Sequence, residues 1–199
     1  MLVVGISGSP RRGGNTELLL DAALEGAAEA AAPPRGTGAE VRKFVANELS
    51  MRPCQNCGGC DRTGQCVLQD DMQEVLTALR EAERIVLATP IHFGTVTAQM
   101  KAVIDRCQCM WVEKYKLGRS PSRAKGKRRG TLLACGGFKK GERFFRAAEA
   151  VANILFACLD VEYAGGRFWP GVDAKGAIRE VPGALAEARA AGAALVEGA

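Results

Sequence analysis

Short apolar runs alternate with helical patterns along this chain of 199 residues, and this alternation constrains its fold more than any other feature. We predict five strands, at residues 2–6, 40–46, 84–88, 130–135 and 160–164. The predicted helices begin at Asn15 or Thr16, at Asp70, at Thr97 and at Glu142, and a final helix covers residues 182–196. Strands that alternate with helices form parallel sheets covered on both faces. The sequence therefore predicts an α/β fold, a doubly wound five-stranded sheet in three αβα layers, with residues 1–199 forming a single domain.

The loop after the first predicted strand is rich in hydrogen-bond donors and glycine. It runs from Gly5 to Thr16 and matches neither the dinucleotide fingerprint nor the P-loop. Its candidate contacts are Ser7, Ser9, Arg11 or Arg12, Asn15 and Thr16. Because the loop also opens a helix, whose free N–H groups favour an anion, we predict a site for a terminal phosphate. The alternative is a βα turn with no ligand.

The loops after the third and fourth strands lie at the same carboxyl edge, where ligands of doubly wound sheets bind. The first of these loops presents backbone groups and ring-packing side chains suited to a flat heterocycle, and comprises Pro90, Ile91, His92, Phe93, Gly94 and Thr95. His92 is the only histidine, and it is either a tunable donor beside the ring or an ordinary loop imidazole. Cys135 ends the fourth predicted strand and Gly136 follows it, and these two residues could complete the pocket.

Four cysteines lie within thirteen residues, at Cys54, Cys57, Cys60 and Cys66. Three thiols at this spacing on one loop can face one inorganic core, as in sites for iron–sulfur cubanes. Zinc sites instead take two Cys pairs separated by a longer stretch. We favour a 4Fe–4S cluster and keep zinc, disulfides and unused thiols as alternatives. Of the other cysteines, Cys107 and Cys158 are expected in the core, and Cys109 could be exposed.

The net charge of +5 is concentrated in one segment, since residues 114–129 hold eight basic and no acidic side chains. We interpret this segment as a solvated surface loop. It could alternatively bind the 2′-phosphate of NADPH or an acidic protein such as a ferredoxin. Nucleic acid is disfavoured, because the run lacks interleaved aromatic residues. The N-terminus lacks the features of a signal peptide and no apolar run reaches membrane-spanning length, so we expect a cytoplasmic protein with no membrane partner.

These motifs together resemble those of the iron–sulfur flavoprotein family, a branch of the flavodoxin-like, NADPH-dependent FMN reductases. The similar features are G-S-P-R-x2-G-N-T after the first strand, the four-cysteine loop, Asp70-Asp71-Met72, and T-P-I-x-F-G-T-V-T-A-Q-M-K-x3-D-R from Thr89. The resemblance covers residues 1–110 clearly and the remainder only through the order of elements. Position 92 differs, because relatives often carry Tyr there.

The resemblance implies a flavodoxin-like sheet that holds FMN and a 4Fe–4S cluster, assembled as a homodimer or homotetramer. It assigns the phosphate contacts to residues 7–16, the ring contacts to residues 90–95, and the cluster to the four cysteines. The implied activity is that of an FMN-dependent oxidoreductase, which transfers electrons between NAD(P)H or ferredoxin and an acceptor. Since a flavin handles both hydride and single electrons, no side chain is required as a catalytic nucleophile or base. The alternative is an NAD(P)H-dependent FMN or quinone reductase without a functional cluster.

Overall fold

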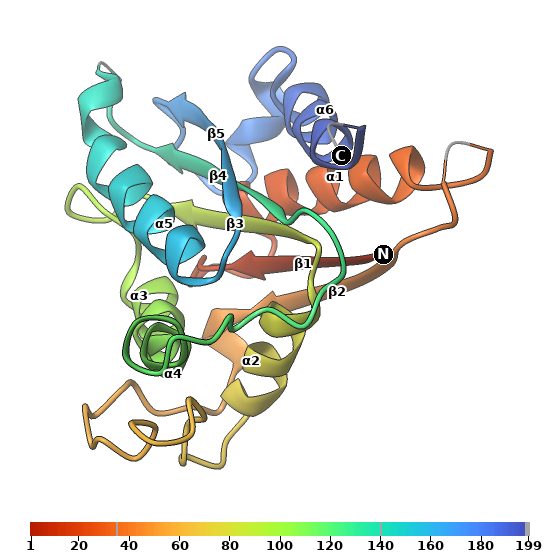
Figure 1. Cartoon of the computed structure of the whole chain (residues 1–199). Coiled ribbons are helices and arrows are strands. Elements are labelled where there is room, and N and C mark those ends of the chain that lie inside the picture. Colours follow the sequence, from red (N-terminus) through yellow and green to blue (C-terminus); the bar gives the residue numbers. More distant parts are fainter. Residues whose placement is uncertain (35, 140, 198–199) are drawn as a thin grey trace.

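Five parallel strands form one sheet in the order β2-β1-β3-β4-β5 (Figure 1). The computed structural model describes residues 1–34, 36–139 and 141–197. The strands are β1 (Leu2–Ser7), β2 (Glu40–Val45), β3 (Arg84–Pro90), β4 (Arg129–Gly136) and β5 (Glu162–Pro170). This strand order is that of flavodoxin-like folds, in which the chain crosses over from β2 to β3 past β1. The predicted fold class is confirmed.

Helices cover both faces of the sheet (Figure 1). The α-helices are α1 (Asn15–Ala30), α2 (Met72–Glu81), α3 (Ala98–Arg106), α4 (Gln108–Trp111), α5 (Arg146–Cys158) and α6 (Ala184–Glu197). Shorter turns are the 3-10 segments η1 (Ala46–Glu48), η3 (Glu142–Phe144) and η4 (Ala177–Glu180), and the π-helical η2 (Val112–Lys116). Helices α1 and α6 pack on one face, and α2, α3 and α5 on the other. No helix in the described part of the chain is long and apolar enough to cross a membrane.

Alternate residues of each strand supply the two cores. In β1, Val3 packs against α1 and α6, whereas Val4 and Ile6 pack on the opposite side, as expected when successive side chains point to opposite faces. Helices α1 and α6, which cover the core that contains Val3, approach each other very closely. A Cβ at Gly192 of α6 would lie 1.8 Å from the Ala23 carbonyl oxygen of α1, so only glycine fits this crossing.

Strand β5 is longer than the sequence predicts, and this moves the loop that follows it. The predicted strand ends at Ala164, immediately before Gly165 and Gly166. In the structure the β4–β5 register shifts between the pairs Gly130–Tyr163 and Leu132–Gly166, with Gly165 at φ 84°, and pairing continues from Gly166 as far as Pro170. A glycine with positive φ is a common way to make such a bulge. The loop after β5 therefore joins the ligand edge of the sheet.

Helix starts agree only in part with the predicted caps. The Thr97 hydroxyl accepts a hydrogen bond from the Met100 N–H at 3.2 Å, which confirms this cap. Helix α1 begins after Gly14 with no side-chain cap, so the predicted cap at Asn15 or Thr16 is wrong. Helix α2 begins at Met72, whose N–H donates to Asp70 at 3.2 Å.

Most of the basic segment is an exposed loop, as predicted, but ion pairs and hydrogen bonds attach it to the rest of the fold. Its first residues, Lys114 and Lys116, belong to η2, and most of its cations have partners within the fold. These pairs are Lys114–Asp160, Lys116–Asp61, Arg119 with the Thr63 carbonyl, Arg123–Glu113, Arg129–Glu162, and Arg128 with the carbonyls of Leu79, Ala82 and Leu159. Most of the basic side chains therefore hold the backbone of this segment in place through contacts with the rest of the fold.

Candidate functional site

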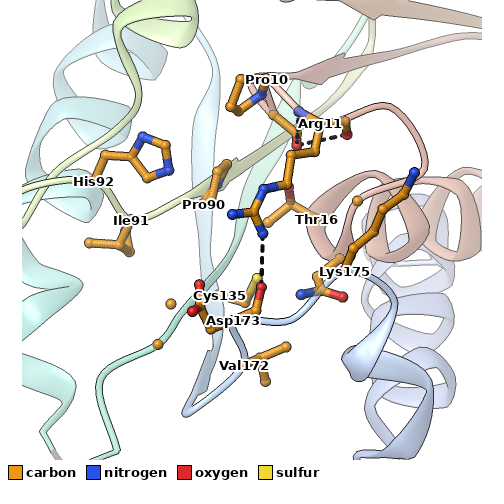
Figure 2. A pocket seen from close by; sticks show the side chains of 15 residues that line it. Pro10, Arg11, Thr16, Pro90, Ile91, His92, Cys135, Val172, Asp173 and Lys175 are labelled. Atoms are coloured by element: carbon orange, nitrogen blue, oxygen red, sulfur yellow. Dashed lines mark hydrogen bonds between the residues drawn. The ribbon is translucent and has the colours of Figure 1, made fainter.

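A pocket lies at the carboxyl edge of the sheet, where the loops after β1, β3, β4 and β5 meet (Figure 2). We call it the strand-end pocket. Nine of the residues predicted to bind a cofactor line it: Ser9, Arg11, Asn15, Thr16, Pro90, Ile91, His92, Cys135 and Gly136. The topology therefore brings together three segments that are far apart in the sequence.

Four other predicted contacts lie outside this lining. Ser7 is fully buried beneath the loop, where its hydroxyl accepts a hydrogen bond from the Ser9 N–H at 3.5 Å. Phe93, Gly94 and Thr95 belong to a tight turn closed by two hydrogen bonds between His92 and Thr95. Phe93 and Gly94 have positive φ values of 48° and 82°, and the Phe93 side chain is fully exposed at the tip. Two central residues with positive φ are the mark of a type I′ turn.

The loop after β5 supplies lining residues that the sequence prediction missed, namely Val172, Asp173 and Lys175. Their signal was present in the polar and glycine-rich run after Pro170, but the strand was expected to end earlier. Figure 2 shows Arg11 reaching across the pocket, where its Nη1 donates to the Asp173 carbonyl at 3.0 Å. Asn15 donates to the Ala174 carbonyl at 2.8 Å and accepts from the Ile178 N–H at 3.2 Å. Arg11 and Asn15 therefore hold this loop over the pocket.

The floor of the pocket suits an anionic group. It contains the start of α1, whose first N–H groups have no side-chain cap. A Cβ at Gly14 would lie 2.8 Å from the Arg11 carbonyl oxygen, so the tight approach of this loop requires glycine. Thr16 is 1% exposed, and its Oγ1 has no hydrogen-bond partner within the described chain. An unpartnered buried hydroxyl beside free N–H groups fits the terminal phosphate of a flavin mononucleotide.

Charge in the strand-end pocket is mixed. Arg11 and Lys175 line it as cations and Asp173 as a carboxylate. Burial, reinforced by the charge of Asp173, raises the pKa of Cys135 to about 12. Cys135 therefore contributes a neutral thiol to the pocket wall near neutral pH.

A second cavity, of about 310 Å³, lies under the cysteine loop. Cys54, Cys57, Cys60 and Cys66 all line it, and we call it the cysteine cavity. Its other wall comes from the end of α3 and from α4, through Arg106, Gln108 and Cys109. Cys107 and Cys158 are buried as predicted, and Cys109, for which the sequence left exposure open, is also buried at 2% exposed.

The four thiols surround the cavity rather than meet at one point. Within the described residues, no three His, Cys, Asp or Glu side chains lie close enough to hold a single metal ion. A cubane carries its thiolates at separate corners, so its ligands stand farther apart than those of one tetrahedral ion. A cavity ringed by four thiols thus has the donor chemistry of an iron–sulfur cluster site.

A buried ion pair ties both ends of the cysteine loop to α3. Arg106 donates from Nη1 to Asp70 at 2.6 Å and to the Arg52 carbonyl at 2.7 Å, and from Nη2 to Asp70 at 2.9 Å. The hydrogen bond from Arg106 is the main reason that the pKa of Asp70 is lowered. Arg52 precedes the first cysteine and Asp70 follows the last, so one guanidinium closes the loop.

A second group of cations holds the cysteine loop at Thr63 and Gly64. Arg80 donates to the Gly64 carbonyl at 2.8 Å and pairs with Glu113, which is 3% exposed. Arg119 donates to the Thr63 carbonyl at 2.8 Å. The loop therefore has a defined path supported by the domain.

Helix α3 connects the two sites. At its start, the Thr97 hydroxyl donates to the carbonyl of Gly8, next to Ser9 of the strand-end pocket, at 2.6 Å. At its end, Arg106 lines the cysteine cavity. A helix rises 1.5 Å per residue, so about 14 Å of helix separates these two positions.

The sequence matches the model of the NADPH-dependent FMN reductases over residues 1–166. An iron–sulfur flavoprotein of Archaeoglobus fulgidus is 37% identical over 176 residues, which cover 87% of this chain and 80% of that protein. Another, of Methanocaldococcus jannaschii, is 41% identical over 106 residues, which cover 53% of this chain and only about half, 51%, of that protein.

The chain belongs to the iron–sulfur flavoprotein family, within the flavodoxin-like FMN reductases. Solved structures agree on the fold: an NAD(P)H:quinone oxidoreductase of Methanothermobacter marburgensis has a TM-score of 0.69 at 20% identity, covering 98% of this chain and 96% of that chain. An FMN-dependent NADH-azoreductase of Bacillus anthracis has a TM-score of 0.71 at 15% identity, covering 98% and 100%.

Proposed function

We propose that this chain holds FMN in the strand-end pocket and a 4Fe–4S cluster in the cysteine cavity, within a single domain. It would transfer electrons between a reduced donor, NAD(P)H or ferredoxin, and an acceptor. The observation that carries the proposal is helix α3, which begins at the loop of one site and ends at the other. Two redox sites separated by one short helix suit the passage of electrons between them.

The residues of the strand-end pocket would bind and orient the flavin. The Thr16 hydroxyl and the N–H groups at the start of α1 would hold the phosphate, with Lys175 nearby as a cation. Pro90 and Ile91 would contact the ring system, and the neutral thiol of Cys135 would avoid placing a charge beside it. When bound, a flavin accepts hydride and releases electrons singly, which lets it work with a one-electron cluster.

The cysteine cavity would supply four thiolates on a loop whose path is already fixed at both ends and at its tip. We also propose a cytoplasmic homodimer or homotetramer, since clustered thiols suit a reducing compartment. Apolar side chains exposed on α4 and α5, Trp111 and Ile154, support assembly with a second chain.

The test is anaerobic purification with FMN, iron, acid-labile sulfide and zinc counted per chain. We expect one FMN and about four each of iron and sulfide. Cys60→Ala should lose the iron and keep the flavin. Cys158→Ala, which changes a buried cysteine outside the cysteine cavity, should keep both.

Other outcomes contradict the proposal in distinguishable ways. FMN with zinc or without metal would favour an FMN or quinone reductase whose cysteine loop is only structural. Absence of FMN from the purified protein, with no binding on addition, would reject the assignment of the strand-end pocket.

A further inference from the structure

Arg106 is a buried cation that links the two ends of the cysteine loop. It is 1% exposed, and it lines the cysteine cavity with Cys66 and Cys109. Three hydrogen bonds from Nη1 and Nη2 reach Asp70 and the Arg52 carbonyl. These bonds explain how Arg106 closes the loop, but they leave one side of the guanidinium unused.

The unused side is Nε. This atom is buried and has no hydrogen-bond partner within the described residues. A charged donor without an acceptor destabilises a protein interior, because it has lost its hydrogen bonds to water and gained none in return. Cys66, one of the four candidate cluster ligands, lines the same cavity as Arg106. Both observations indicate that the free N–H is meant for an acceptor that occupies the cavity.

We propose that Arg106 positions and tunes the cluster. Its Nε–H donates a hydrogen bond to a sulfur at the Cys66 corner, and its charge stabilises the reduced form. This inference rests on the proposed function, because it requires a cluster held by the four cysteines. Reduction adds one electron, supplied by the reduced donor, and so one negative charge to the cluster and its thiolates. No covalent bond forms or breaks in the protein, and no proton is transferred.

The sign of the effect follows from charge. A nearby cation and a hydrogen bond to a ligating sulfur both stabilise the more negative, reduced cluster, and so raise its reduction potential. Asp70 lies against the same guanidinium and partly offsets its charge. Removing the charge of Asp70 should therefore act in the opposite direction to removing that of Arg106. Simple loosening of the loop would not produce opposite shifts.

The test uses anaerobically purified protein carrying FMN and cluster, with the potential of each measured by spectroscopic redox titration. In Arg106→Gln, we expect the equilibrium constant for cluster reduction to fall about tenfold, as for loss of one charge-assisted hydrogen bond. For one electron this is a drop of about 59 mV. Arg106→Lys keeps the charge and should shift less, and Asp70→Asn should shift upward. The FMN potential should stay unchanged in all three.

Arg128→Lys is the matched control, because Arg128 is also buried but binds the carbonyls of Leu79, Ala82 and Leu159, outside the cysteine cavity. It should leave the cluster potential unchanged. If Arg106→Gln fails to retain the cluster, the test depends on Arg106→Lys and Asp70→Asn. A lower cluster potential in Arg106→Lys together with a higher one in Asp70→Asn supports the proposal.

Equal potentials in wild type, Arg106→Lys and Asp70→Asn would overturn this inference while leaving the proposed function intact. Shifts of the same sign in Arg106→Lys and Asp70→Asn would also overturn it, because that pattern reflects a loosened loop. A wild-type protein that binds no iron and sulfide would overturn the proposed function itself, and this inference with it.

Discussion

Replacing Thr16 by valine should change the stability of the flavin-free protein and its affinity for FMN in opposite directions. The Thr16 side chain is 1% exposed, and its Oγ1 lacks a partner within the described chain. Valine has nearly the same shape and removes only the hydroxyl. If this hydroxyl exists to bind the phosphate, its loss should stabilise the flavin-free protein and weaken flavin binding. The two effects have opposite signs.

Both magnitudes follow from the hydrogen-bond inventory. A buried polar group without a partner costs about 1–3 kcal/mol, so Thr16→Val should raise the free energy of unfolding of the flavin-free protein by up to this amount. A hydrogen bond to a charged group contributes about 1.5–3 kcal/mol, so the Kd for FMN should rise about 10- to 150-fold. Riboflavin has no phosphate, and its Kd should hardly change.

The assays are urea unfolding of flavin-free protein and fluorescence titration with FMN and riboflavin. Thr131→Val is the matched control, because Thr131 is 3% exposed and its hydroxyl donates to the Gly165 carbonyl at 2.7 Å. It should destabilise the protein and leave both Kd values unchanged. The reasoning is refuted if Thr16→Val destabilises the flavin-free protein like the control, or if FMN and riboflavin affinities fall together.

Two further predictions concern the support of the sites. Burial alone would raise the pKa of Glu113, but hydrogen bonds from Arg123 and Arg80 lower it overall, so the stability it provides is present above its ordinary value of 4.5 and is lost as the pH falls below it. Glu113→Gln should therefore cost about 3 kcal/mol at pH 7 and flatten the acid dependence of urea unfolding, and an unchanged pH profile would contradict this role. Gly192→Ala should destabilise by about 1–3 kcal/mol or more despite the higher helix propensity of alanine, because its Cβ would clash with the Ala23 carbonyl; a raised Tm would show that the two helices can separate without cost.

The order of elements was predictable because it depends on local patterns. Strand β3 is a continuous apolar run, and the Thr97 cap precedes a helix with a regular apolar stripe. Both follow from the residues next to them. Strand β5 was not predictable in the same way, because Gly165 and Gly166 are typical of a strand end. Only the neighbouring β4, which pairs on both sides of the irregularity, shows that the strand continues.

The roles of charged residues were harder to predict, because ion pairs join distant parts of the chain. Arg106 ends an amphipathic helix, and nothing nearby in the sequence indicates that it would reach Asp70 and Arg52. Likewise the sequence shows the basic segment but not its pairing with Asp61, which lies more than fifty residues earlier in the chain. Spacing identified the cysteines, whereas only the fold reveals what supports them.

The two candidate sites share a physical signature that the sequence alone could not give. Natural proteins pair almost every buried polar group, so the exceptions are informative. Within the described residues, two buried side-chain polar atoms lack a partner: Thr16 Oγ1 in the strand-end pocket and Arg106 Nε in the cysteine cavity. Each lies in a hollow that was identified on independent grounds, one by its loops and one by its thiols. If these two donors lacked partners by chance, we would not expect one of them to lie in each candidate site. We therefore expect that filling either cavity stabilises the protein through the donor that now lacks a partner.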